Sequence, residues 1–158
     1  MKQHPFNLRK WQHWFALGFG SGLAPKAPGT FGTLAAIPMV LLLWPLGWFW
    51  MIGFILLGTL LGIYICDSVS RDIGTDDHGS IVWDEVIGFA ITMFAVPLTA
   101  LNILVAFLLF RLLDIIKPWP IRWFDRNVHG GFGVMLDDIV AGILACALLH
   151  GVWLPLQI

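Results

Sequence analysis

Charge is scarce in this chain. Asp, Glu, Lys and Arg make up 12% of its 158 residues, whereas a soluble domain carries about 25%. The net charge of −1 provides no excess of positive charge for a nucleic-acid partner, so we expect none. Cysteine is scarce as well, because Cys66 and Cys146 each stand alone in an apolar run. That spacing excludes a disulfide framework and a cysteine metal motif.

The chain is instead rich in apolar and aromatic residues. Hydrophobic residues make up 58% of it, with nine Trp and twelve Phe, and the mean hydropathy is +0.83. Trp gathers at the interfaces of membrane proteins. We therefore predict an integral membrane protein in contact with a lipid bilayer, with one domain over 1–158. The first residues are polar, so we expect no signal peptide.

Apolar runs divided by Pro and Gly predict an all-α fold, a polytopic membrane helical bundle of about five hydrophobic segments. The expected helices cover about 30–45, 48–71, 81–96, 98–116 and 133–155, with several residues of boundary error. The apolar stretch from Lys10 to Leu23 is shorter than the roughly 20 residues of a span. For 1–29 we therefore expect a short interfacial helix and a loop, with the bundle over 30–158.

The distribution of Lys and Arg predicts the orientation. With five spans, the loops around Lys26, 71–78 and 117–126 lie on one side, and the turns on the other side carry no Lys or Arg. The positive-inside rule places the charged side in the cytoplasm. Every acidic residue falls on that side too.

Two pairs of neighbouring acids stand at the predicted starts of membrane helices. Carboxylates near lipid depth are costly and usually functional. The alternative for one acid of each pair is that it serves just to complement the helix dipole. Mg²⁺ in proteins takes one or two carboxylates together with phosphate oxygens of the substrate. We therefore predict a site for one or two Mg²⁺ ions, with these ligands: Asp84, Glu85, Asp137 and Asp138.

Basic residues lie close to the acids in the sequence. Arg111 and Asp114 share a helix face. An internal salt bridge between them, without a role in binding, is the alternative interpretation. Positive charge beside a metal site suits an anionic phosphate, which predicts these phosphate-binding residues: Lys26, Thr30, Arg111, Lys117 and Arg122. A loop Lys such as Lys26 can also be a simple headgroup contact. His78 titrates near neutral pH and is a candidate acid or base, or a solvated loop residue.

Four blocks of sequence resemble the phosphatidylglycerophosphatase A family. They are PGTFGT at 28–33, DHGSIVWDE at 77–85, DIIKPWPIRWFD at 114–125 and GGFGVMLDD at 130–138. The resemblance implies a Mg²⁺-dependent lipid phosphatase of the bacterial inner membrane that converts phosphatidylglycerophosphate to phosphatidylglycerol. It carries the family's motif residues onto Asp77, Asp84, Glu85, Asp114, Lys117, Asp125, Asp137 and Asp138.

The leading hypothesis is metal-assisted hydrolysis of a phosphomonoester, with Asp77, His78 or Asp114 as general base or acid. A covalent phospho-aspartate is the mechanistic variant. A phosphotransferase acting on cytidine diphosphate-activated alcohols is an alternative, although its Asp-Gly-x2-Ala-Arg motif is absent. A cation transporter is another, although transporter sites usually lie at the bilayer midplane. The sequence predicts no oligomeric state.

Overall fold

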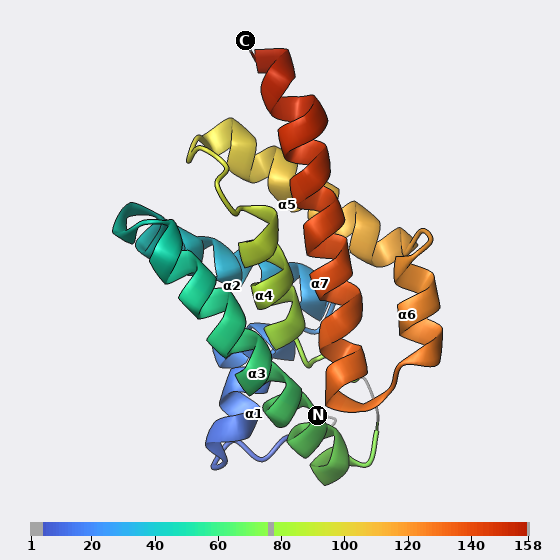
Figure 1. Ribbon diagram of the computed structural model, residues 1–158. Coiled ribbons are helices and arrows are strands. Elements are labelled where there is room, and N and C mark those ends of the chain that lie inside the picture. The colour runs from blue at the N-terminus through green and yellow to red at the C-terminus, as the bar shows by residue number, and fades with distance from the viewer. Residues whose placement is uncertain (1–4, 76–77, 158) are drawn as a thin grey trace.

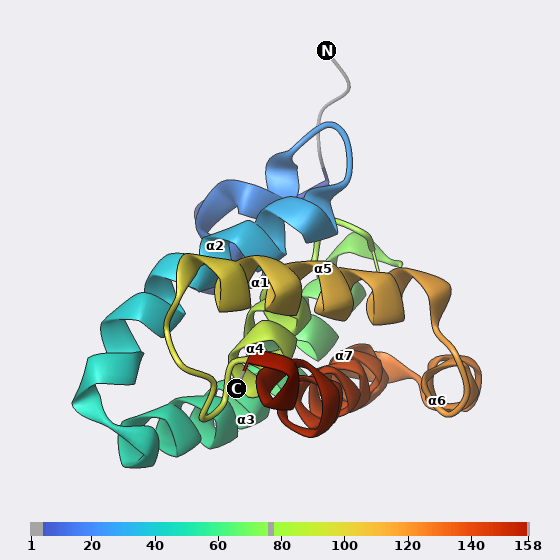
Figure 2. The same ribbon diagram turned by 90° about the horizontal axis from the view of Figure 1, so that it is seen from above.

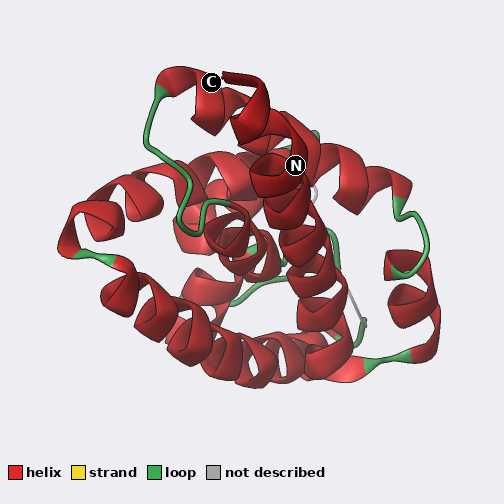
Figure 3. Cartoon of the chain, turned by 45° about the horizontal axis from the view of Figure 1, so that its top comes forward, coloured by secondary structure: helices red, strands yellow, loops and turns green. Residues whose placement is uncertain are grey.

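The structure is a computed structural model that describes residues 5–75 and 78–157, and every regular element in these ranges is helical (Figure 3). The predicted all-α class is confirmed. In chain order the elements are α1 (Trp11–Ala16), η1 (Gly18–Leu23), α2 (Pro28–Leu43), η2 (Trp44–Leu46), α3 (Trp48–Ile73), α4 (Trp83–Thr92), α5 (Ala100–Ile116), α6 (Ile121–Asn127), α7 (Gly130–Leu148), η3 (Leu149–Trp153) and η4 (Leu154–Gln157).

In the described part of the chain, three helical stretches are long and apolar enough to cross a membrane. They are α2 with η2 (Pro28–Leu46), α3 (Trp48–Ile73), and α7 with its continuation (Gly130–Gln157). Their starts and ends follow the predicted segments to within a few residues, because Pro and Gly bound the apolar runs. The expected count of about five spans is not confirmed, since α4 and α5 are not among these three.

Helix α4 is short and enclosed, which corrects the predicted helix over 81–96. It has ten residues, or about 15 Å of rise, half of a hydrocarbon core. The helix ends at Thr92, with its cap residue Met93 at φ −84° and ψ 2°, and Ala95 follows in a left-handed conformation with φ 57°. Except for Ile91, all residues of α4 are buried, because α2, α3, α5 and α7 surround it (Figures 1 and 2).

Glycines hold α4 and α7 in close contact. A Cβ on Gly142 would lie 2.4 Å from the carbonyl oxygen of Gly88, and a Cβ on Gly88 would lie 2.6 Å from Cζ of Phe110. Helices approach this closely in membranes only where small residues face each other. The contact places the first turn of α4 beside the third turn of α7.

Glycines also set the start of α7, which begins at Gly130 rather than near 133. A Cβ on Gly131 would lie 2.1 Å from the carbonyl oxygen of Ile63 in α3, so the first turn of α7 presses against the α3 backbone. Asp137 and Asp138 therefore lie in the third turn and not at the helix start. The segment before α7, expected as a loop, contains the short helix α6.

The N-terminal segment packs on the protein. His13 is 1% exposed, and its Nε2 lies 3.0 Å from Oδ2 of Asp72 near the end of α3. The N–H of Val82 donates to the carbonyl oxygen of Ala16 at 2.8 Å, so the segment also supports the loop that leads into α4. The predicted short helix is present as α1 and η1, and it contacts α3 and α2.

The end of the molecule at the α2–α3 turn is aromatic. Trp48, Phe49 and Trp50 are 60–73% exposed there, as expected for side chains at a membrane interface. Nε1 of Trp44 donates to the carbonyl oxygen of Val96 at 2.9 Å, which ties the loop after α4 to this end. Helix α4 therefore points its acidic first turn away from the aromatic end.

Candidate metal and phosphate site

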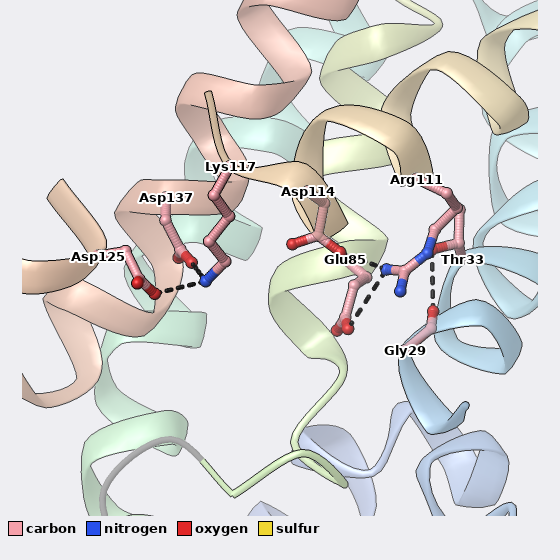
Figure 4. A network of polar contacts seen from close by, with 8 residues as sticks. All are labelled: Gly29, Thr33, Glu85, Arg111, Asp114, Lys117, Asp125 and Asp137. Atoms are coloured by element: carbon pink, nitrogen blue, oxygen red, sulfur yellow. Dashed lines mark hydrogen bonds and ion pairs between the residues drawn. The ribbon is translucent and has the colours of Figure 1, made fainter. Parts of the chain in front are cut away.

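Four helices bring six carboxylates and two basic side chains together (Figure 4 shows six of these eight residues). The acids are Asp84 and Glu85 of α4, Asp114 of α5, Asp125 of α6, and Asp137 and Asp138 of α7; the bases are Arg111 of α5 and Lys117 at its end. The two acid pairs that are far apart in the sequence thus share one site.

Two groups of carboxylates are close enough for each to hold a cation. Oxygens of Asp84, Glu85 and Asp138 lie within 4.8 Å of one another, and oxygens of Asp114, Asp137 and Asp138 do likewise. Asp138 belongs to both groups. Carboxylate oxygens are the ligands that Mg²⁺ prefers, so the residues present fit such an ion.

Burial makes these carboxylates costly without a cation. Asp138 is 2% exposed and Glu85 9%, and Oδ2 of Asp138 and Oε2 of Glu85 have no hydrogen-bond partner among the described residues. Burial, reinforced by the charge of Asp138, raises the pKa of Glu85 to about 8. The helix dipole at the start of α4 offsets about 0.3–1 kcal/mol, whereas an uncompensated buried ion costs several kcal/mol. The dipole alone does not explain the acid pair.

Arg111 links the two groups of acids. Its Nη1 lies 2.5 Å from Oδ2 of Asp114 and 3.7 Å from Oε1 of Glu85, and the Asp114 contact is the same-face pair expected from the sequence. Nε of Arg111 is buried and has no acceptor among the described residues. The guanidinium therefore has a donor left for a ligand oxygen.

Gly29, which was not predicted as a site residue, leaves space for the side chains of Glu85 and Arg111. A Cβ at this position would lie 2.3 Å from Oε1 of Glu85 and 3.0 Å from Nη2 of Arg111. Any larger residue would push the carboxylate and the guanidinium aside. The hydroxyl of Thr33, one turn later, donates to the carbonyl oxygen of Gly29 at 2.9 Å.

Lys117 links the second group to α6. It ends α5 in a left-handed conformation with φ 46°, and its Nζ donates to Asp125 and, at 2.6 Å, to Oδ2 of Asp137. Burial acts to lower the pKa of Lys117, but the two carboxylates outweigh it and raise that pKa above its ordinary value. The ammonium is therefore charged, and it brings Asp125 into the site.

Other predicted site residues have their contacts elsewhere. Lys26 and Arg122 are exposed, and Nη2 of Arg122 donates to the carbonyl oxygen of Ile116 at 3.1 Å. Thr30 is partly buried. The ring of His78 packs edge-on against Phe6 with centroids 5.2 Å apart, and its Nδ1 accepts from the N–H of Ser80. Asp77 lies outside the described residues.

The chain is similar to known proteins along most of its length. The family model described as Phosphatidylglycerophosphatase A matches residues 14–153. Phosphatidylglycerophosphatase A of Escherichia coli (strain K12) is 52% identical over 139 residues, covering 87% of this chain and 81% of the relative. That of Haemophilus influenzae (strain Rd) is 47% identical over 142 residues, covering 89% and 87%. No solved structure matches the chain.

Proposed function

This chain belongs to the phosphatidylglycerophosphatase A family and is a phosphatase, and we propose that it hydrolyses phosphatidylglycerophosphate to phosphatidylglycerol and phosphate with Mg²⁺ as cofactor. The observation that carries this proposal is the meeting of the two acid pairs, from α4 and α7, with Arg111 and Lys117 at one site. Acidic metal ligands beside two fixed cations suit the hydrolysis of a phosphate ester, because both metal and cations stabilise the charge on its oxygens.

The proposed Mg²⁺ ligands are Asp84, Glu85, Asp137 and Asp138. Support comes from the buried oxygens of Glu85 and Asp138, which lack hydrogen-bond partners among the described residues, and from the short separations within the acid groups. When bound, Mg²⁺ supplies Lewis-acid polarisation of a phosphate oxygen. The protein's part is to hold the ligands in fixed positions, and close packing of α4 on α7 does so.

Arg111 and Lys117 are the proposed partners of the reacting phosphoryl group. Both are fixed by carboxylates on two sides, so they need little reorganisation when charge moves onto the phosphoryl oxygens. The open Nε donor of Arg111 supports this role. We assign the exposed Lys26 and Arg122, with Thr30, to the outer part of the lipid headgroup, where long basic side chains contact anionic lipid.

Proton transfer falls to a smaller set of residues. The candidates are Asp114, which lies among the acids, and His78 and Asp77, which precede α4 in the chain. Direct attack by water is the proposed route, and attack by an aspartate is the variant. Acid quenching during turnover with labelled substrate decides between them, because a phospho-aspartate would leave labelled phosphate on the protein.

We place the site at the cytoplasmic face of the bacterial inner membrane. The aromatic turn between α2 and α3 carries no Lys or Arg. The basic residues belong to the segments before α2, at the end of α3, and between α5 and α7: Lys10, Lys26, Arg71, Lys117, Arg122 and Arg126. The positive-inside rule assigns such a face to the cytoplasm. An Arg126→Cys variant tests it: a membrane-impermeant maleimide should label it in inverted vesicles and not in intact spheroplasts.

The deciding experiment measures phosphate release from phosphatidylglycerophosphate and phosphatidic acid in mixed micelles, with Mg²⁺ or with a chelator. We expect release from phosphatidylglycerophosphate that stops when the chelator is added and returns with excess Mg²⁺. Purified protein that releases no phosphate from this lipid would overturn the proposal. Cation movement in proteoliposomes without phosphate release would favour the transporter alternative.

A further inference from the structure

Building on the proposed function, we infer that the site holds two divalent cations at the same time, with Asp138 shared between them and Asp114 as a ligand of the second. The first position is formed by Asp84, Glu85 and Asp138. The second is formed by Asp114, Asp137 and Asp138. This assigns Asp114 to metal binding and leaves proton transfer to other groups.

One residue, Asp138, is common to the two acid groups. Each group brings three carboxylate oxygens within 4.8 Å of one another. Two-metal phosphatase sites place their ions about 3.5–4 Å apart, a separation that the two oxygens of one carboxylate can bridge. Asp138 is in the position that such a bridge needs.

The surroundings of Asp138 point to a missing cation. The residue is 2% exposed and its side chain contacts Asp114. Among the described residues, Oδ2 has no hydrogen-bond partner, and no Lys or Arg forms an ion pair with it. The two basic side chains stand at the flanks instead: Arg111 contacts Glu85 and Asp114, and Lys117 contacts Asp137 and Asp125. The middle of the site is thus the part without positive charge.

The balance of charge favours two ions over one. With all six carboxylates ionised, the form that binds a metal, negative charge exceeds that of the two described cations by four. One divalent cation would leave an excess of two at largely buried positions, which is costly. Two divalent cations balance it.

Mn²⁺ binding to the full-length protein tests the inference without relying on activity. Protein stripped with a chelator is titrated with Mn²⁺, and free and bound ions are followed by electron paramagnetic resonance. We expect two Mn²⁺ per chain, with the spectrum of a spin-coupled pair at saturation. Asp114→Asn and Glu85→Gln should each bind one Mn²⁺ and give the spectrum of an isolated ion.

A matched control is Asp67→Asn, which makes the same chemical change at a partly exposed acid of α3 that is paired with Arg71 and belongs to neither acid group. It should bind two coupled ions like the wild type. Gel filtration and thermal unfolding of each variant show that lost binding is not lost folding. Asn and Gln are suited to this test, because they remove charge from crowded acids without changing their size.

The outcomes separate this inference from the proposed function. A single Mn²⁺ in the wild type, unchanged in Asp114→Asn, would overturn the second position. If phosphate release still required Mg²⁺ in that case, the proposed function would stand. Release of phosphate in excess chelator, with no Mn²⁺ bound, would overturn both the Mg²⁺ requirement and the two positions.

Discussion

Nζ of Lys117 lies 2.6 Å from Oδ2 of Asp137, and the same ammonium donates to Asp125. One side chain therefore joins the end of α5 to both α6 and α7. This bridge fixes the edge of the acid site that faces away from Arg111 (Figure 4).

Replacing this lysine should affect both the reaction and the fold. In Lys117→Met we expect phosphate release to fall about 100-fold or more, because a fixed positive charge on the phosphoryl group is lost. Stability should fall by about 1–2 kcal/mol, since the unpaired carboxylates are only partly buried. The double variant Lys117→Met/Asp125→Asn should regain stability and not activity. Phosphate assays and thermal unfolding measure the two effects, and full activity in Lys117→Met would remove the residue from the reaction.

The shared acid groups predict which carboxylates are essential. Asp84→Asn and Asp138→Asn should each lower phosphate release by at least about 100-fold, because polarisation by a metal is worth several kcal/mol. Membrane insertion and elution in gel filtration should not change. Asp67→Asn, at an acid that belongs to neither acid group, should keep its activity. If both site variants retained activity, these acids would not be metal ligands.

The Asp138→Asn variant, although inactive, should be more stable than the wild type when no metal is bound. This buried carboxylate lacks a cation, so Asp138→Asn is expected to raise the free energy of unfolding by about 1–3 kcal/mol in excess chelator. Mg²⁺ should stabilise the wild type, by about 2.7 kcal/mol at a hundred times its dissociation constant, and the variant much less. Thermal unfolding with and without Mg²⁺ measures both. A variant stabilised by Mg²⁺ as strongly as the wild type would contradict the proposed role.

The glycine contact between α4 and α7 should matter for both stability and metal binding. A methyl group at Gly142 would meet the backbone of Gly88 at 2.4 Å, so Gly142→Ala must separate the helices. We expect a loss of about 1–3 kcal/mol together with weaker Mn²⁺ binding. Gly53→Ala is the matched control, because a Cβ there meets nothing within 4 Å. Equal behaviour of the two variants would show that the close approach is not needed.

His78 is expected to matter less than the acids. A residue that transfers the proton contributes about 100- to 10,000-fold, whereas His78 contacts Phe6 and Ser80. We predict that His78→Ala lowers phosphate release by less than about 10-fold, through loosening of the loop before α4. A loss of 100-fold, with a changed pH profile, would instead make His78 the acid or base.

The sequence predicts this fold best where Pro and Gly interrupt apolar runs. Helices α2 and α3 were expected within a few residues of their observed bounds for that reason. Helix α4 was expected to be longer, because apolar composition does not distinguish a helix buried in protein from one that faces lipid. The turn that follows Thr92, with Ala95 at φ 57°, carries no signal in its residue types. The short α6 was missed because its segment is rich in Pro and Arg.

For the site, residue types were predictable and partners were not. Adjacent acids beside apolar runs identify Asp84, Glu85, Asp137 and Asp138 as unusual from the sequence alone. Their meeting depends on the contact of Gly88 with Gly142, which is a property of tertiary packing. The choice of Lys117 over Arg122 as the bridging cation likewise follows from the left-handed end of α5, and Gly29 is recognisable only once Glu85 is placed.

The enclosure of α4 has a consequence for how the protein responds to its surroundings. Changes in acyl-chain length strain the helices that touch lipid, chiefly through tilting, whereas the helix carrying Asp84 and Glu85 is sheathed by protein on nearly every side. Bilayer thickness should therefore govern how substrate arrives more than the arrangement of these acids. Because the enzyme's product is itself a membrane lipid, the lipid composition around the protein changes as it works. The arrangement of Asp84 and Glu85 should stay the same through that change.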